Sequence, residues 1–194
     1  MAIVRKECID NQPMPNYHCN ECGVVEKGRL RGAFYVKKDL QDRLVNNIDD
    51  YTVWEELIEG ENLFLIPSTR GTFDGGTRVA VAGFGDDVEK MTGKDFVAVV
   101  NDPNHNVDNA KFYEALAVNY KEYIFGFRTG DQLRVATDAI TILDVQDPVE
   151  DDVESVVTWN ATVTWNQKVP EVIVPVYKLD PRVKALFTCN ETTA

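Results

Sequence analysis

The stretch Val157-Thr-Trp-Asn-Ala-Thr-Val-Thr-Trp165 decides what kind of fold this chain adopts. Apolar side chains occupy every second position, and hydroxyl or amide side chains stand between them. Because successive side chains of a strand point to opposite faces, this alternation predicts a half-buried β-strand. Extended from Ser155 to Asn166, the strand would span about 35–40 Å at ~3.3 Å per residue, longer than most strands.

Further strands are expected on both sides of this one. The segment 170–177 is typical of an edge strand, because neither Pro170 nor Pro175 can donate to a ladder. A mainly β, α+β fold is therefore predicted, a β-sandwich or open barrel of about seven to eight strands. The other predicted strands are 29–37, 63–66, 94–101, 122–129, 132–137 and 140–145, with a strand pair around a long loop in the glycine-rich region 70–87.

One helix, at residues 108–120, is expected to pack on this sheet. Asp108 can cap it, and its apolar residues recur at spacings of three and four. Two shorter helices are expected, one at 39–46 and one at Thr52, where a Thr-x-x-Glu capping box precedes an apolar run that stops at Gly60. The expected apolar face of the main helix is Phe112, Ala115, Leu116 and Tyr120.

The chain of 194 residues suits one main domain with a segment at each end. Residues 1–28 are irregular and rich in cysteine, and they predict an N-terminal arm or small lobe. Residues 29–179 hold the strand patterns of the predicted β-sandwich domain. Residues 180–194 are interpreted as a C-terminal arm.

The charge of the chain limits its partners. Twenty Lys and Arg residues against 32 Asp and Glu residues leave a net charge of −12. Such a surface repels phosphates, so we expect DNA to pass it without specific binding. No apolar run is long enough to predict a membrane span. The N-terminus lacks an apolar signal core, so synthesis and retention in a cytoplasm are expected.

Cys19-Asn-Glu-Cys22 is the sharpest chemical signal, because two thiolates at this spacing suit one tetrahedral zinc ion. Cys8 with either Cys189 or His18 could complete the ligand set. Cys189 is the better fourth ligand, since His18 adjoins Cys19. Free or packed cysteines are the alternative, and a disulfide framework is not expected in a chain without a secretion signal.

The remaining motifs do not indicate an enzyme. Gly83-Phe-Gly85 lacks the third glycine and the lysine of a phosphate-binding loop. His18 and His105 have no Ser or Cys nucleophile at a recognisable spacing. The acidic run 144–154 could supply oxygen ligands to calcium, but it lacks an Asp-x-Asp-x-Asp-Gly loop, so a solvated linker is favoured.

Trp159 and Trp165 lie on one face of the opening strand. Exposed, they would form a stacking platform for a carbohydrate or a base, but packing in a core or at a subunit interface is the commoner use of tryptophan. The glycine-rich region is a second candidate for contacts between subunits, because glycine permits close backbone approach. The candidate interface residues are Trp159, Trp165, Gly75, Gly76 and Phe84.

Several segments of the chain resemble a known family of virion proteins. The segments Phe112-Tyr-Glu-Ala-Leu116, Tyr123-Ile-Phe-Gly-Phe-Arg128 and 148–165, with the glycine-rich region and the cysteine-bearing N-terminal segment, resemble tail-tube and tail-hub proteins of tailed bacteriophages. The resemblance extends over roughly residues 25–178.

It implies a virion structural protein whose sheets join those of neighbouring subunits, often as a hexameric ring, around a channel for the genome. Its partners would be itself and other virion proteins. A head-to-tail connector or other virion accessory protein, and a ligand- or carbohydrate-binding β-sandwich module, are the alternatives.

Overall fold

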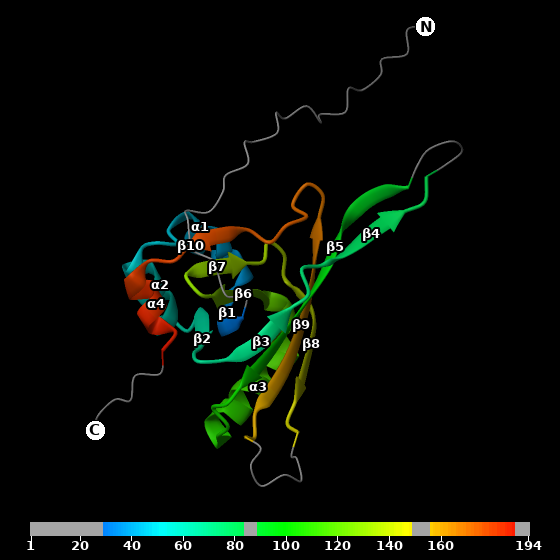
Figure 1. Cartoon of the computed structure of the whole chain (residues 1–194). Coiled ribbons are helices and arrows are strands. Elements are labelled where there is room, and N and C mark those ends of the chain that lie inside the picture. Colours follow the sequence, from blue (N-terminus) through cyan, green and yellow to red (C-terminus); the bar gives the residue numbers. More distant parts are fainter. Residues whose placement is uncertain (1–28, 84–88, 149–155, 189–194) are drawn as a thin grey trace, which may run out of the picture.

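The computed structural model describes residues 29–83, 89–148 and 156–188. Their strands form one antiparallel ten-stranded sheet in the order β10-β7-β6-β1-β3-β5-β9-β8, with β2 added to β1 and β4 to β5 (Figure 1). The predicted mainly β, α+β fold is confirmed, with more strands than the sequence indicated. The strands are β1 Leu30–Lys37, β2 Leu63–Ile66, β3 Arg70–Phe73, β4 Thr77–Val81, β5 Lys90–Asp102, β6 Tyr123–Thr129, β7 Gln132–Val135, β8 Ile140–Gln146, β9 Trp159–Lys168 and β10 Val176–Lys178.

The sheet folds back on itself and encloses the core between its two halves. In the described residues, β1 and β3 are joined by a single register pair, so the β10-β7-β6-β1 half can turn toward the β3-β5-β9-β8 half. Aromatic rings meet across the interior. The ring centroids of Phe125 in β6 and Trp165 in β9 are 5.6 Å apart, and those of Phe73 in β3 and Phe127 in β6 are 5.0 Å apart. The result is an open barrel filled with aromatic side chains.

Trp165 and Trp159 belong to this interior. Trp165 has no exposed surface and stacks on Phe73 and Phe96, with centroid distances of 5.9 and 5.5 Å. Trp159 is 8% exposed and lies 5.3 Å from the Tyr113 ring. Side chains enclosed by their own subunit leave no surface for a neighbour or a sugar. The interface prediction is therefore wrong for these two residues, and the alternative of core packing holds.

The expected helices form, but two of them begin earlier than predicted. Asp50 caps α2 by accepting a hydrogen bond from the Thr52 backbone N–H at 3.0 Å, and Asn106 caps α3 in the same way from Asn109 at 2.8 Å. Among the described residues, no helix is long and apolar enough to cross a membrane. The helices are α1 Gln41–Asn46, α2 Tyr51–Glu59, α3 Val107–Asn119 and α4 Pro181–Leu186, with 3-10 turns at Lys38–Leu40 and Tyr120–Glu122.

The segment expected as a C-terminal arm instead closes one end of the core. Val183 of α4 and Phe187, which follows it, have no exposed surface. The ring of Phe187 lies edge-on to Phe34 at 6.2 Å and to Trp54 at 5.9 Å. Residues 180–188 are therefore part of the domain, and the predicted boundary after residue 179 is wrong. The predicted N-terminal segment 1–28 lies outside the described residues.

β3 and β4 follow one another along the same edge of β5, instead of pairing with each other as expected. β3 pairs with the second half of β5 and β4 with the first half. Gly75 and Gly76 make the break between them, with φ values of 77° and 88°, a region that side chains disfavour. Asp74 bridges the break, because its Oδ1 accepts hydrogen bonds from the backbone N–H groups of Gly76 and Val97 at 2.9 and 3.0 Å.

Candidate functional site

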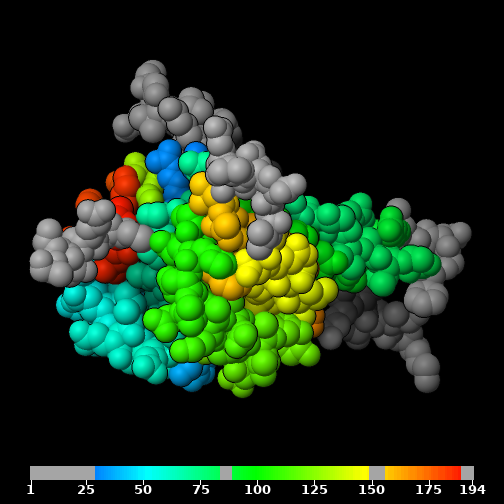
Figure 2. Space-filling model, turned by 90° about the horizontal axis from the view of Figure 1, so that it is seen from below, coloured from blue at the N-terminus to red at the C-terminus, as the bar shows by residue number. Residues whose placement is uncertain are grey.

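The hairpin of β4 and β5 projects from the side of the domain as a two-stranded ribbon (Figures 1 and 2). Before Gly93, β5 pairs only with β4 in the described part of the chain, and from Gly93 onward it also pairs with β9. A Cβ at Gly93 would lie 2.3 Å from the Gln167 carbonyl oxygen, so only glycine lets the two strands approach there. We call residues 77–83 and 89–95 the β-arm.

The β-arm buries almost none of its side chains. No residue of β4 is buried, and Val81 at its end is 55% exposed. Along the described part of the arm, Gly93 is the one buried residue. An isolated two-stranded ribbon is marginally stable in water unless a face packs on something. Apart from Gly93, every described residue of the β-arm therefore keeps part of its surface accessible.

Two basic side chains face each other across the β-arm. Arg78 is the register partner of Lys94. Neither forms an ion pair with a described residue. Like charges directly opposite one another destabilise an antiparallel pair. The chain has a net charge of −12, so this pair of neighbouring cations differs in sign from the chain as a whole.

The predicted interface glycines lie at the base of the β-arm. Gly75 is exposed, and a Cβ there would meet nothing within 4 Å. Gly76 packs under the ring of Phe96, which a Cβ would contact at 2.4 Å. Phe84, the third predicted interface residue of this region, lies outside the described residues. The role of these residues between subunits stays a prediction.

The end of the sheet formed by β8 is acidic. The outer edge of β8 pairs with no strand of the described segments. Its exposed side chains include Asp144 and Ile142, the latter 59% exposed. No Lys or Arg occurs anywhere in residues 135–167. The acidic residues of that stretch are Asp138, Asp144, Asp147, Glu150, Asp151, Asp152 and Glu154.

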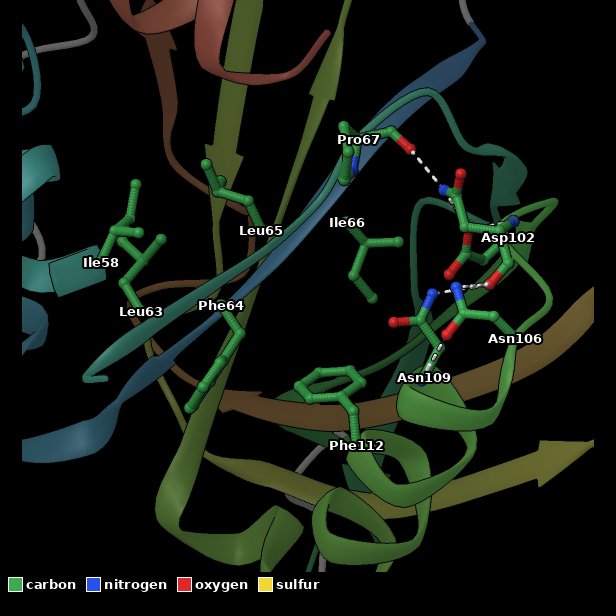
Figure 3. Close-up of a pocket in the computed structure, with 11 residues that line it drawn as sticks. Ile58, Leu63, Phe64, Leu65, Ile66, Pro67, Asp102, Asn106, Asn109 and Phe112 are labelled. Carbon is green, nitrogen blue, oxygen red and sulfur yellow. Dashed lines mark hydrogen bonds between the residues drawn. The ribbon is translucent and has the colours of Figure 1, made fainter. Parts of the chain in front are cut away.

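A groove of about 540 Å³ lies between β2 and the first half of α3 (Figure 3). We call it the β2 groove. One wall is apolar and belongs to β2, α2 and α3, and the other is polar and belongs to the end of β5, the loop before α3 and the first turn of α3. The apolar wall includes Ile58, Leu63, Phe64 and Phe112, and the polar wall consists of Asp102, Asn104, Asn106 and Asn109.

Asp102 is the one carboxylate in the β2 groove, and it is 3% exposed. Its Oδ1 accepts hydrogen bonds from the backbone N–H and Nδ2 of Asn104 at 2.9 and 2.7 Å. Its Oδ2 accepts a hydrogen bond from the Tyr113 hydroxyl at 3.0 Å. The carboxylate thus ties the end of β5 to α3 and fixes the polar wall.

Burial raises the pKa of the Tyr113 hydroxyl, and the charge of Asp102 raises it further. The same two causes, in the same order, raise the pKa of Tyr35, which lies beneath in β1 with no exposed surface. Both hydroxyls therefore keep their protons at a pH where an exposed tyrosine would ionise.

Alkaline pH is expected to destabilise the fold through these two tyrosines. In the unfolded chain both ionise near pH 10, whereas in the fold their pKa values are raised. The contribution of the two tyrosines to the free energy of unfolding is complete below about pH 10. It is lost as the pH rises toward the folded pKa values, at about 1.4 kcal/mol per pH unit for each tyrosine. Urea unfolding between about pH 9 and about pH 11.5 measures this slope. Tyr113→Phe should make it shallower, and an unchanged slope would contradict the assignment.

The sequence alone does not reveal this network, because the segment 101–104 indicates only a turn. The available signal is the spacing of Asn104, Asn106 and Asn109 just before the main helix, because amide side chains gather where backbone groups need local partners. The pairing of Asp102 with Tyr113 depends on how α3 packs, which no local pattern encodes.

His105 fastens the loop before α3 to the end of β8. Its ring stacks on Trp159 with centroids 4.6 Å apart, and its Nε2 lies 2.9 Å from Asp147 Oδ1. Asp144 accepts a hydrogen bond from Gln146 Nε2 at 2.8 Å. Two acidic side chains of the predicted linker are thus engaged within the fold. Among the described residues, no group of three or more His, Cys, Asp or Glu side chains is arranged to hold a metal ion.

The predicted zinc ligands all lie outside the described residues, so the zinc site stays a prediction. The described ends that lead to them are close together, because the ring of Phe187 lies 2.6 Å from where a Cβ of Gly32 would stand. The residues concerned are Cys8, Cys19, Cys22 and Cys189, with His18 as the alternative ligand.

Comparison of the chain with protein-family models, with curated proteins and with solved structures finds no match in any of the three. Function is therefore inferred from the β-arm, the β8 edge and the β2 groove.

Proposed function

We propose that this chain is a non-enzymatic structural subunit of a tailed-bacteriophage particle that assembles into a tail-tube or tail-hub ring. The observation that carries the proposal is the β-arm, whose strand β4 buries none of its residues. Such a ribbon is stabilised when a neighbouring subunit covers it. The resemblance of the sequence to tail-tube and tail-hub proteins supports the same kind of assembly.

The outer edge of β8 in a neighbouring subunit is the surface that fits the β-arm best. An open strand edge accepts a further strand through its backbone hydrogen bonds. Arg78 would meet Asp144, with Lys94 beside it on the same face of the arm, so the charges match. The arm and the β8 edge are different surfaces of one chain, so the contact is head-to-tail and can close into a ring, which we expect to be hexameric.

A ring of this protein would present an acidic surface to DNA. With a net charge of −12 per chain, repulsion would let DNA pass without specific binding. This role places the protein in the virion after synthesis in the host cytoplasm, with other virion proteins as partners. A head-to-tail connector or accessory protein would instead use the β-arm on a different protein. The carbohydrate-binding alternative loses its stacking platform, since Trp159 and Trp165 are buried.

Reversing both cations of the β-arm is expected to weaken self-association. Arg78→Glu with Lys94→Glu replaces one like-charged pair by another, so the repulsion between the two side chains within the arm is retained. The attraction between the arm and the acidic β8 edge of a neighbour becomes repulsion. Two exposed charge contacts of this kind predict a weakening of about tenfold or more at 0.15 M salt. Sedimentation velocity and negative-stain imaging across a concentration series measure the association.

The matched control is Lys38→Glu with Lys178→Glu, which makes the same charge change on exposed residues away from the arm and from β8. This control should associate like the unmodified chain. Asp144→Lys should restore association when it is mixed with the arm variant. A chain that stays monomeric at high concentration, or an arm variant that associates like the control, would overturn the proposal.

A further inference from the structure

β2 has a free edge that opens into the β2 groove. It pairs with β1 along one edge and with no other strand of the described residues. Its sequence, Leu-Phe-Leu-Ile, carries no charge or proline that would protect an open edge. The groove is closed at one end, where Asn104 Nδ2 donates to the Pro67 carbonyl oxygen at 3.5 Å. An apolar edge of this kind is suited to one further strand.

The walls of the β2 groove define the chemistry of that strand. Figure 3 shows Phe64 and Phe112 pointing toward one another on one side, with ring centroids 5.5 Å apart, and Asp102 with Asn106 on the other. The lining residues include one carboxylate and no Lys or Arg. The occupant should therefore combine β-branched apolar residues with a neighbouring positive charge.

We propose that residues 2–6 of the same chain, Ala-Ile-Val-Arg-Lys, add to the free edge of β2 as a further strand. Ile3 and Val4 are β-branched residues suited to the apolar wall, and Arg5 and Lys6 carry the charge that Asp102 attracts.

Residues 189–194 are the other candidate, because the described chain ends near β2, where the Ser68 backbone N–H donates to the Phe187 carbonyl oxygen at 3.3 Å. Their one charged side chain is Glu191, however, and they contain no β-branched apolar pair. Charge and side-chain shape both favour the N-terminal residues.

The chain connectivity favours the chain's own segment over one from a neighbour. Residues 7–28 lead from this segment into β1, the strand that pairs with β2. Arg29 is four positions before Ala33, the first β1 residue paired with β2, or about 13 Å along the strand. At ~3.3 Å per residue, residues 7–28 reach up to about 70 Å. A tethered segment within reach has an effective concentration in the millimolar range, which a separate copy does not match.

Hydrogen exchange of the β2 amides tests the proposal in the full chain. Ile3→Asp with Val4→Asp should speed exchange in residues 63–66 by at least about tenfold, because their free edge would lose its cover. A synthetic peptide of residues 1–8 added to this variant should restore the protection. Val24→Asp with Val25→Asp is the matched control, with the same charges in the same segment, and should leave exchange unchanged.

The proposal is independent of ring assembly, so the measurement is made at concentrations where the protein is monomeric. Equal exchange in the unmodified chain and in the Ile3, Val4 variant would overturn it. Protection that disappears on dilution of the unmodified chain would overturn the assignment to the same chain and indicate a neighbouring copy instead. Protection that is independent of concentration and lost only in that variant is the expected result.

Discussion

Trp165→Ala is expected to lower the free energy of unfolding by about 3–5 kcal/mol, as large-to-small changes in closed cores do. The indole has no exposed surface, and three aromatic rings surround it. These rings come from β3, β5 and β6, so they belong to both halves of the sheet. The cavity left by the indole would therefore lie between the two halves of the sheet. Partial collapse of the core into this cavity would also shift the two halves relative to one another.

Urea unfolding followed by circular dichroism measures this loss. The matched control is Ile173→Ala in the loop before β10, whose side chain is 70% exposed and whose truncation should change stability by no more than about 0.5 kcal/mol. The comparison also separates a core role from an interface role. If Trp165→Ala left monomer stability intact but abolished self-association, the indole would be an interface residue after all.

Phe187→Ala should be nearly as severe, lowering the free energy of unfolding by about 3–4 kcal/mol. The ring has no exposed surface and fills the space between Phe34 and Trp54. It also lies beneath the guanidinium of Arg128, whose carbon is 5.8 Å from the ring centroid. Removal of the ring would leave that buried cation without its apolar support, which adds to the cost of the cavity.

Thermal and urea unfolding of Phe187→Ala should be compared with Arg182→Ala, a change in the short helix just before Phe187 at a side chain that is 70% exposed. Arg182→Ala is expected to cost less than about 1 kcal/mol, since its ion pair is on the surface. Similar small losses in both variants would mean that residues 180–188 are dispensable, as expected of an arm.

Periodicity predicted the strands well wherever one face of a strand is buried. The alternation ending at Trp165 forms as expected, because a shift by one residue would expose the apolar set. The strand that starts at Leu30 also forms, although both of its faces are buried. Alternation shows only that a face is buried, not what buries it. For that reason the sequence could not distinguish a tryptophan enclosed by its own subunit from one enclosed by a neighbour.

The mistakes arose where a contact distant in sequence decides the outcome. In α3 the expected apolar face included Ala115, which is exposed, and omitted Tyr113, which is buried because Asp102 accepts its hydrogen bond. Residues 180–188 contain too few apolar positions to show a helical period, and their burial depends on the space beside Phe34. The β-arm was unpredictable for a related reason, since the alignment of β3 and β4 follows from the length of β5.

The length of β5 also determines how the subunit carries a mechanical load. β5 continues from the β-arm directly into the middle of the sheet and shares ten register pairs with β9. A pull on the arm along this strand is resisted by all of these pairs in shear, so their hydrogen bonds must fail together. A pull across the strand would part them one at a time. A ring whose subunits are joined through such arms would thus resist forces that stretch its circumference. Each arm continues into β5, which is held in the sheet by its pairing with β9.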